Sequence, residues 1–380
     1  MIDTNILSNS LQVSLHELSW LAKNLLRPND KNYIWTAVER NLFATVEIRP
    51  RAGYFDIPWQ PNSLFPIPDL EQPFNKTLAQ VYDERSIEIF NQSQQSGKRI
   101  VIMWSGGIDS TSMLCAFIKN LSTDQLKSIV VCTTTEGIAE NTFFYETQIR
   151  KRFDLLHLRD LDFSDQFLDR HILLHGDPGD CIFGPSVARY RHLWQDDQYL
   201  RPWKDSRHLL YHMYHDNNNL DFSSWFVNGV CDNLSDLQDQ GLYTNLKTLS
   251  DWHWWFYYNF KWQGSMTRAV SWYKQDRKAK IAQKNIKEFF DLCFFSGTNF
   301  QIWSYQSASS LYGNQMQDHK LQAKNYIFEV DGNDHYRHSK RKEISVVSRW
   351  QDPIVVDQDA VHYYYNEPKI IELFRDLLCR

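Results

Sequence analysis

The sequence predicts an α/β protein whose core is a doubly wound, parallel β-sheet. Between residues 98 and 190, short apolar segments alternate with segments of helical periodicity. Strands that alternate with helices of this length form parallel sheets with right-handed crossovers. In addition, the first and fourth apolar segments each run directly into a glycine-rich turn. Both turns are therefore expected at the carboxyl ends of strands, where sheets of this kind bind ligands.

Length and composition limit how the chain can be organised. A chain of 380 residues corresponds to two or three domains. We expect a small N-terminal domain of uncertain fold over residues 1–95 and a second domain over residues 96–380. The second domain would comprise the sheet core at 98–190 and a helical C-terminal part at 191–380. The net charge of −5 provides no general attraction to nucleic acid or to an anionic membrane.

Cellular location is inferred from the cysteines and from targeting patterns. None of the six cysteines forms a CxxC pair, so free, reduced thiols and a cytoplasmic location are expected. No apolar run approaches the ~18 residues of a membrane span, and the N-terminus lacks the basic and apolar regions of a signal peptide. The 13 histidines show no zinc-ligand spacing. We therefore expect neither a membrane nor a zinc ion among the partners.

The first 97 residues are expected to contain two helices, one strand and an extended segment. Leucines with helical spacing at 11–26 predict a helix, and alternating apolar residues at 43–48 predict a short strand. Five prolines between residues 53 and 73 favour an extended segment at the surface. A second helix is expected at 76–95, ended by Gly97. Its inward side would comprise Leu78, Val81, Tyr82, Ile87 and Phe90.

The sheet core is expected to hold four strands connected by helices. The strands are placed at residues 99–104, 128–133, 155–158 and 172–175. Helices are placed at 110–120 and 141–152, the second with Phe144, Ile149 and Phe153 packed inward. The first strand is apolar throughout, which is typical of a central strand buried on both faces.

The helical part beyond residue 190 has one ambiguous stretch, at residues 252–287. Aromatic residues at its start are followed by several lysines and arginines. Aromatic rings beside basic residues could hold a single nucleic-acid strand by stacking. The alternative is a helix buried by its aromatic residues and followed by a solvated basic helix, which we favour because the chain is net acidic. Further helices are expected at 303–311 and from residue 368 onward.

The first glycine-rich turn has the sequence SGGIDS at residues 105–110. A tight glycine turn between a strand and a helix exposes backbone N–H groups and the helix N-terminus together, which makes an anion site. The turn is not a Walker A loop, which requires Gly-Lys-Ser/Thr, and it is not a GxGxxG dinucleotide loop. The alternative is an ordinary turn in which serine and aspartate cap the helix.

The second turn, GDPGDCIFG at residues 176–184, places another aspartate just beyond a strand. Asp180 and Asp109 would then lie at the same edge of the sheet. Two carboxylates beside a bound pyrophosphate are suited to holding Mg²⁺ against it. A solvated turn without a metal is the alternative.

Together the two turns carry a resemblance to a known superfamily. The SGGxDS pattern resembles the PP-loop of the N-type ATP pyrophosphatases. Residues 176–184 are similar to the second loop of the synthetase domains of asparagine synthetases and β-lactam synthetases. The resemblance implies an adenine nucleotide α-hydrolase-like fold with ATP and Mg²⁺ as cofactors, and Asp109 and Asp180 as metal ligands. The implied nucleotide-binding positions are Ser105, Gly106, Gly107, Asp109, Ser110, Thr133, Gly176 and Gly179.

The chain departs from that family on the expected substrate side, where two family glutamates are Asp177 and Cys181 here. Residues 319–324 resemble a family helix of the KxxLR type, and residues 340–343 resemble a segment of the RxKE type whose lysine reaches the active site. Lys342 is therefore the first candidate for a catalytic cation, with Lys340 as the second. A solvated basic run at the surface is the alternative.

The resemblance implies an ATP-dependent, amide-forming ligase. Such an enzyme adenylates a carboxylate-type substrate and passes it to an amine or ammonia, releasing AMP and pyrophosphate. Glutamine-dependent relatives expose a cysteine directly after Met1, whereas Ile2 follows here and the first cysteine is Cys115. We therefore expect the nitrogen to come from free ammonia, a separate ammonia-supplying subunit or an amine on the substrate.

Two other functions remain open. A PP-loop enzyme that modifies a nucleoside in tRNA or DNA could use the basic and aromatic stretch at 252–287. A nucleotide-binding module that has lost catalysis would not need both Asp109 and Asp180, so their presence argues against it. We expect a small-molecule substrate rather than nucleic acid, because the chain is net acidic.

Overall fold

The computed structural model of the chain describes residues 50–54, 65–161, 165–184, 198–215, 220–262, 265–266, 288, 290–308 and 320–340. The helix expected at 11–26, the strand at 43–48 and the C-terminal helix from residue 368 lie outside these residues, and so does Lys342.

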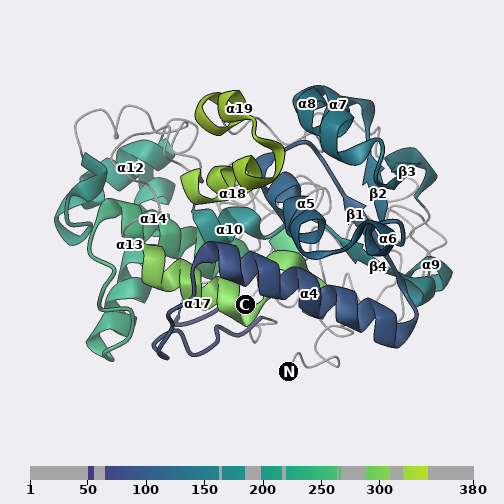
Figure 1. The fold of residues 1–380 in the computed structure, drawn as a ribbon. Coiled ribbons are helices and arrows are strands. Elements are labelled where there is room, and N and C mark those ends of the chain that lie inside the picture. Colours follow the sequence, from purple (N-terminus) through teal and green to yellow (C-terminus); the bar gives the residue numbers. More distant parts are fainter. Residues whose placement is uncertain are drawn as a thin grey trace, which may run out of the picture.

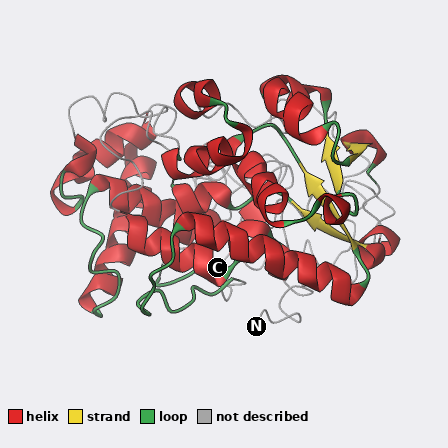
Figure 2. Ribbon diagram, in the orientation of Figure 1, coloured by secondary structure: helices red, strands yellow, loops and turns green. Residues whose placement is uncertain are grey.

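A four-stranded, all-parallel sheet lies at one end of the described structure (Figure 2). Its strands are β1 (Arg99–Met103), β2 (Val130–Thr133), β3 (Asp154–His157) and β4 (His171–Leu174), in the order β3-β2-β1-β4. The four expected strands and the α/β class are thus confirmed. The apolar residues 100–102 of the central strand β1 are buried, as expected. Ile102 of β1 is paired with Leu174 of β4, so these two strands end at the same level.

Helices pack around the sheet, and further helices form the part of the described chain beside it (Figure 1). Near the sheet are α4 (Leu78–Ser96), α5 (Ile108–Asn120), α6 (Thr123–Leu126), α7 (Thr135–Glu140), α8 (Thr142–Phe144), the π-helical turn η2 (Tyr145–Ile149), the 3-10 turn η3 (Leu158–Asp160), α9 (Asp165–Arg170) and α10 (Gly179–Phe183). The helical part comprises η5 (Gln198–Leu200), η6 (Lys204–Ser206), α12 (Arg207–His215), α13 (Leu220–Asp239), α14 (Leu249–Phe256), η7 (Tyr257–Lys261), η8 (Phe294–Ser296), α17 (Thr298–Ser307), α18 (Leu321–Asp331) and α19 (Asp334–Ser339).

Helix α4 forms at the expected position, but the prediction that Ile87 faces inward is wrong. Thr77 and Gln80 form a capping box at its start, and Gly97 ends it with a φ of 66°. Ile87 is 42% exposed, whereas Ser86 is buried and donates a hydrogen bond to the carbonyl oxygen of Ala116 at 3.1 Å. A polar side chain therefore takes the inward position because α5 offers it a buried acceptor.

Two other expected helices have different bounds. The segment expected as one helix at 141–152 is divided, because Asn141 caps the short helix α8 and the chain then widens into the π-helical turn η2. The side chains of Phe144, Ile149 and Phe153 are nevertheless buried, as predicted. The helix expected at 303–311 begins earlier, at Thr298, since polar residues in its first turn hid the start.

The aromatic residues at the start of the ambiguous stretch belong to the core. Trp252, Trp254 and Trp255 are fully buried, and all lie in α14. The Nε1 atom of Trp254 donates to Ser304 Oγ at 2.7 Å, and that of Trp255 donates to Asn233 Oδ1 at 3.3 Å. Rings held in this way cannot stack on a nucleic-acid strand, which confirms the buried-helix alternative for residues 252–262.

Arg51 ties the short segment 50–54 into the helical part. Its guanidinium is buried, donates to the carbonyl oxygen of Phe65 at 2.7 Å and to Gln301 Oε1 at 2.7 Å, and stacks on the ring of Trp262.

Within the part of the chain that the structure describes, the five cysteines are buried free thiols, as expected. The same residues include no helix with the length and apolar character of a bilayer span.

Candidate functional site

The two glycine-rich turns meet at the carboxyl edge of the sheet, because β1 and β4 are neighbours. A Cβ atom added to Gly179 would lie 2.8 Å from Asp109 Cγ, and one added to Gly176 would lie 3.3 Å from the backbone nitrogen of Ser110. Larger residues at either position would push the first turn away. The glycines of the second turn thus set the spacing between the two turns.

The first turn leads into α5 with a geometry that suits an anion. Gly106 has a φ of 77°, and a Cβ atom there would lie 2.3 Å from the carbonyl oxygen of Gly137. Gly107 is the N-cap residue of the 13-residue helix α5 and has no side chain to cover the helix end. The first backbone N–H groups of a helix lack intrahelical partners and carry a partial positive charge. The turn therefore places a helix N-terminus at the sheet edge, where an anion could bind.

Two serines brace this turn from within. The backbone nitrogen of Ser105 donates to Ser110 Oγ at 3.1 Å, and the two hydroxyl oxygens lie 3.0 Å apart. Ser110 Oγ also donates to the carbonyl oxygen of Gly107 at 3.2 Å. Each hydroxyl has a single O–H donor, so it would bind an oxyanion only by giving up its acceptor within the turn.

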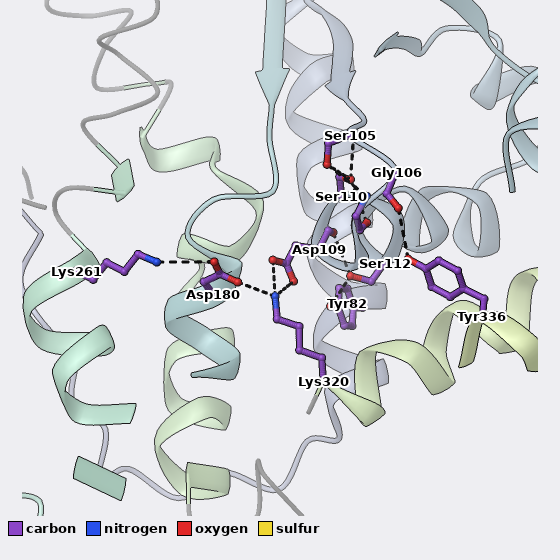
Figure 3. A network of polar contacts seen from close by, with 11 residues as sticks. Tyr82, Ser105, Gly106, Asp109, Ser110, Ser112, Asp180, Lys261, Lys320 and Tyr336 are labelled. Atoms are coloured by element: carbon purple, nitrogen blue, oxygen red, sulfur yellow. Dashed lines mark hydrogen bonds and ion pairs between the residues drawn. The ribbon is translucent and has the colours of Figure 1, made fainter. Parts of the chain in front are cut away.

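The centre of the site is a buried ammonium group between two carboxylates (Figure 3). Lys320 Nζ lies 2.6 Å from both carboxylate oxygens of Asp109 and 2.8 Å from Asp180 Oδ1. The Lys320 side chain is 2% exposed, whereas those of Asp109 and Asp180 are 19% and 20% exposed. A second ammonium, Lys261 Nζ, lies 3.8 Å from Asp180 Oδ2. The Lys320 ammonium therefore approaches from the protein interior, whereas Lys261 and both carboxylates are partly accessible to solvent.

The charges of the site determine the protonation state of Lys320. Burial lowers the pKa of its ammonium group. The carboxylates of Asp109 and Asp180, and the hydrogen bonds to them, raise this pKa by more than burial lowers it, so the pKa of Lys320 is above its ordinary value. Lys320 is therefore positively charged at neutral pH. The two aspartates and two lysines leave the cluster close to neutral.

Asp109 and Asp180 could hold a magnesium ion. Among the described residues there is no group of three or more potential metal-ligating side chains. However, Mg²⁺ is commonly bound by one or two carboxylates, and phosphate oxygens and water complete its coordination. The ammonium of Lys320 is a cation standing between the two carboxylates, which shows that the pair accepts positive charge at this position. The donor set thus fits the ion that the sequence predicts.

The cation expected in the C-terminal part is only partly accounted for, since Lys342 lies outside the described residues. Lys340 is not part of a solvated run: its side chain is 9% exposed, and its Nζ lies 3.1 Å from Glu140 Oε1. Glu140 borders the first turn, because a Cβ atom added to Gly106 would lie 2.9 Å from Glu140 Cβ. Lys340 therefore lies beside the glycine turn, through Glu140.

Helices α18 and α19 hold this side of the site together. Tyr336 Oη in α19 makes a long hydrogen bond of 3.5 Å to the carbonyl oxygen of Gly106 (Figure 3). Lys324 Nζ in α18 donates to the carbonyl oxygen of Lys340 at 3.3 Å. The C-terminal part thereby contacts the turn that β1 and α5 create.

Thr133 lies at the end of β2, next to the first turn. A Cβ atom added to Gly137 would lie 2.9 Å from Thr133 Oγ1 and 3.3 Å from the carbonyl carbon of Ser105.

The structure thus brings nearly all the sequence-predicted positions to one edge of the sheet. Those at this edge are Ser105, Gly106, Gly107, Asp109, Ser110, Thr133, Gly176, Gly179, Asp180 and Lys340. Their functional roles stay predictions.

Sequence reasoning missed Lys320 and Lys261. Lys320 lies in the segment 319–324 that resembles a family helix, but no role followed from that resemblance. A physical signal was available: two aspartates brought to one partly buried position require a counter-ion, because unpaired buried charge is costly. That argument predicts that a cation is present but does not identify which lysine supplies it.

No family model, no curated protein and no solved structure matches this chain. The geometry of the site and the motifs in the sequence are therefore the basis for assigning a function.

Proposed function

We propose that this chain is an ATP-dependent ligase of the PP-loop type, built on a doubly wound sheet like that of the adenine nucleotide α-hydrolases. It would adenylate a carboxylate-type substrate and transfer it to an amine or ammonia, releasing AMP and pyrophosphate. The observation that carries the proposal is the meeting of the SGGIDS turn, the N-terminus of α5 and the Asp109–Asp180 pair at one sheet edge. Each of these features suits one part of a magnesium triphosphate.

The first turn would bind the pyrophosphate that leaves. Backbone N–H groups of the turn and the positive end of α5 favour a polyanion there, and the hydroxyls of Ser105 and Ser110 would donate to it by giving up their acceptors within the turn. Gly106 and Gly107 allow phosphate oxygens to approach the backbone because no side chain covers it. Binding the leaving group tightly favours attack at the α-phosphorus.

Asp109 and Asp180 would hold Mg²⁺, which supplies positive charge to the phosphate oxygens when bound. Lys320 and Lys261 place two ammonium groups at the same edge. The adenylate-forming step builds negative charge on the phosphate oxygens, and the later attack of an amine builds an oxyanion. Fixed cations at such positions lower both barriers. Lys340, and Lys342 as the first sequence candidate, would act on the side of the turn that Glu140 borders.

The nucleic-acid alternative has less support than before. Its sequence argument was the basic and aromatic stretch at 252–287. The aromatic rings at 252–262 lie in the core of the helical part, and the basic residues at 277–287 lie outside the described residues. A small-molecule substrate, with nitrogen from ammonia, a separate subunit or a substrate amine, remains the proposal.

The test is isotope exchange between pyrophosphate and ATP, which requires adenylation but no nucleophile. Purified protein is incubated with ATP, labelled pyrophosphate, Mg²⁺ and fractionated pools of carboxylic acids. We expect one pool to move the label into ATP, and full turnover with ammonia or an amine to yield AMP. Formation of ADP and orthophosphate as the primary products would contradict the proposal.

A further inference from the structure

The Lys320 ammonium occupies the position that a magnesium ion would need. It contacts both oxygens of Asp109 at 2.6 Å and Asp180 Oδ1 at 2.8 Å. Mg²⁺ binds oxygen ligands at about 2.0–2.1 Å. A metal on these same oxygens would place two cations in the gap between two side chains, where they repel one another. Lys320 and the metal therefore compete for the carboxylate pair.

From this competition we infer that Lys320 is an internal counter-ion that exchanges partners when magnesium and a triphosphate arrive together; the inference rests on the ATP-dependent function proposed above. Before binding, the ammonium neutralises Asp109 and Asp180. On binding, Mg²⁺ takes over the carboxylates, and the ammonium moves to the phosphate oxygens. The exchange regulates the site, because neither ligand alone completes it.

Burial explains why both ligands are needed. The Lys320 side chain is 2% exposed, so an ammonium that leaves the carboxylates without a new anion stays buried and unpaired, which is costly. Mg²⁺ alone would create that state. A triphosphate supplies the missing anion, so the metal and the nucleotide each raise the other's affinity, as linkage requires. The partly exposed carboxylates give the metal its route of approach.

The backbone at Lys320 fits a residue held in place by its ion pairs. Lys320 is the N-cap of α18 and has a φ of 58°; among the described non-glycine residues, only Tyr243 also has a positive φ. Non-glycine residues adopt this conformation when their surroundings hold them there. Figure 3 shows the side chain running from the start of α18 directly to the gap between the two carboxylates.

The experiment measures Mn²⁺ binding by electron paramagnetic resonance, without and with a non-hydrolysable ATP analogue. Wild-type protein should bind Mn²⁺ weakly alone and at least roughly tenfold more tightly with the analogue. Lys320→Met should bind Mn²⁺ alone at least roughly tenfold more tightly than wild type, because the competing cation is gone. Lys261→Met, whose ammonium lies 3.8 Å from one oxygen, should show a smaller gain. Lys340→Met should show none, since its partner is Glu140.

An unchanged or lower Mn²⁺ affinity of Lys320→Met overturns the inference. Adding Asp109→Asn to Lys320→Met should remove the gain, and a gain that persists places the metal elsewhere and also overturns it. These measurements need no turnover. If pyrophosphate exchange is absent while Lys320→Met gains affinity, the proposed function fails and the counter-ion role stands. If pyrophosphate exchange occurs but Lys320→Met gains no Mn²⁺ affinity, the proposed function stands and the counter-ion role fails.

Lys320→Met could also lose stability, since two carboxylates lose their buried counter-ion. Its melting temperature is then measured with Mn²⁺ and with NaCl at equal ionic strength. The inference requires Mn²⁺ to raise the melting temperature of the variant more than that of wild type, and an equal rise contradicts it.

Discussion

Two buried cations, Lys320 and Arg51, have opposite surroundings. Lys320 contacts three carboxylate oxygens that solvent can still reach. Arg51 contacts carbonyl oxygens and the amide oxygen of Gln301, and it stacks on Trp262. Burial lowers the pKa of Arg51, whereas the two aspartates raise that of Lys320. A buried cation with neutral, fixed partners stabilises a fold, while one with accessible anionic partners can exchange them.

The largest effect is expected from removing the aspartate partners of Lys320. Asp109→Asn and Asp180→Asn should each lower Mg²⁺-dependent pyrophosphate release by at least roughly a hundredfold, because a carboxylate that positions charge at the phosphates is lost. Steady-state rates across a magnesium titration measure this, and circular dichroism checks that the fold persists. Full activity of Asp180→Asn with a normal magnesium dependence would refute the two-turn site.

Arg51→Met tests the other cation. It should lower the free energy of unfolding by about 2–3 kcal/mol, since buried acceptors at Phe65 and Gln301 lose their donor. Urea denaturation measures the loss. Arg99→Met is the control and should cost less, because Arg99 makes its ion pair with Asp154 and its hydrogen bonds to the carbonyl oxygens of Ser128 and Lys127 at the surface. Loss of pyrophosphate exchange by Arg51→Met at unchanged stability would erase the distinction between the two cations.

A pH titration extends the comparison to a buried histidine of the helical part. Burial lowers the pKa of His253 to about 3, so it is neutral in the folded state. The unfolded chain, with a histidine pKa near 6.5, binds one more proton between about pH 6.5 and 3. The free energy of unfolding should therefore fall by up to about 1.4 kcal/mol per pH unit as the pH drops through this range. Urea midpoints measured from pH 7 to 5 should fall less for His253→Gln; parallel curves would contradict the assignment.

A smaller effect is expected where the two turns touch. Gly179→Ala should lower pyrophosphate release by roughly tenfold, because its Cβ atom would lie 2.8 Å from Asp109 Cγ and displace the carboxylate. Gly297→Ala is the matched control, since its Cβ atom would meet Arg85 Nε at an ordinary 3.4 Å. Equal rates for the two variants would show that the contact between the turns does not matter for catalysis.

For nucleic-acid binding we expect no effect at all. Fluorescence anisotropy with a labelled single-stranded RNA should show no tight binding, because the aromatic rings of α14 are buried and the chain is net acidic. Binding that weakens steeply between about 50 and about 200 mM salt would indicate phosphate contacts. Such a result would favour the nucleoside-modifying alternative.

Local sequence was sufficient to predict the sheet and its turns. The apolar segment before Ser105 predicts a buried strand, which the structure contains, and Gly106 at a φ of 77° has the conformation that its turn requires. Strand order then brought Asp109 and Asp180 to one edge, because parallel neighbours end together. These are effects of short-range periodicity and of rules that link sequence order to topology.

The tertiary structure alone decided which cations complete the site and which polar residues enter the core. Lys320 is separated from Asp109 by 211 residues, and Arg51 from Gln301 by 250, so no local pattern pairs them. Ile87 was predicted inward for the same reason: hydrophobicity ranked it above Ser86, whose buried acceptor lies on another helix. A sequence does not distinguish a buried lysine or arginine from a solvated one. The free energy that makes burial of the charge possible comes from partners that only the folded chain supplies.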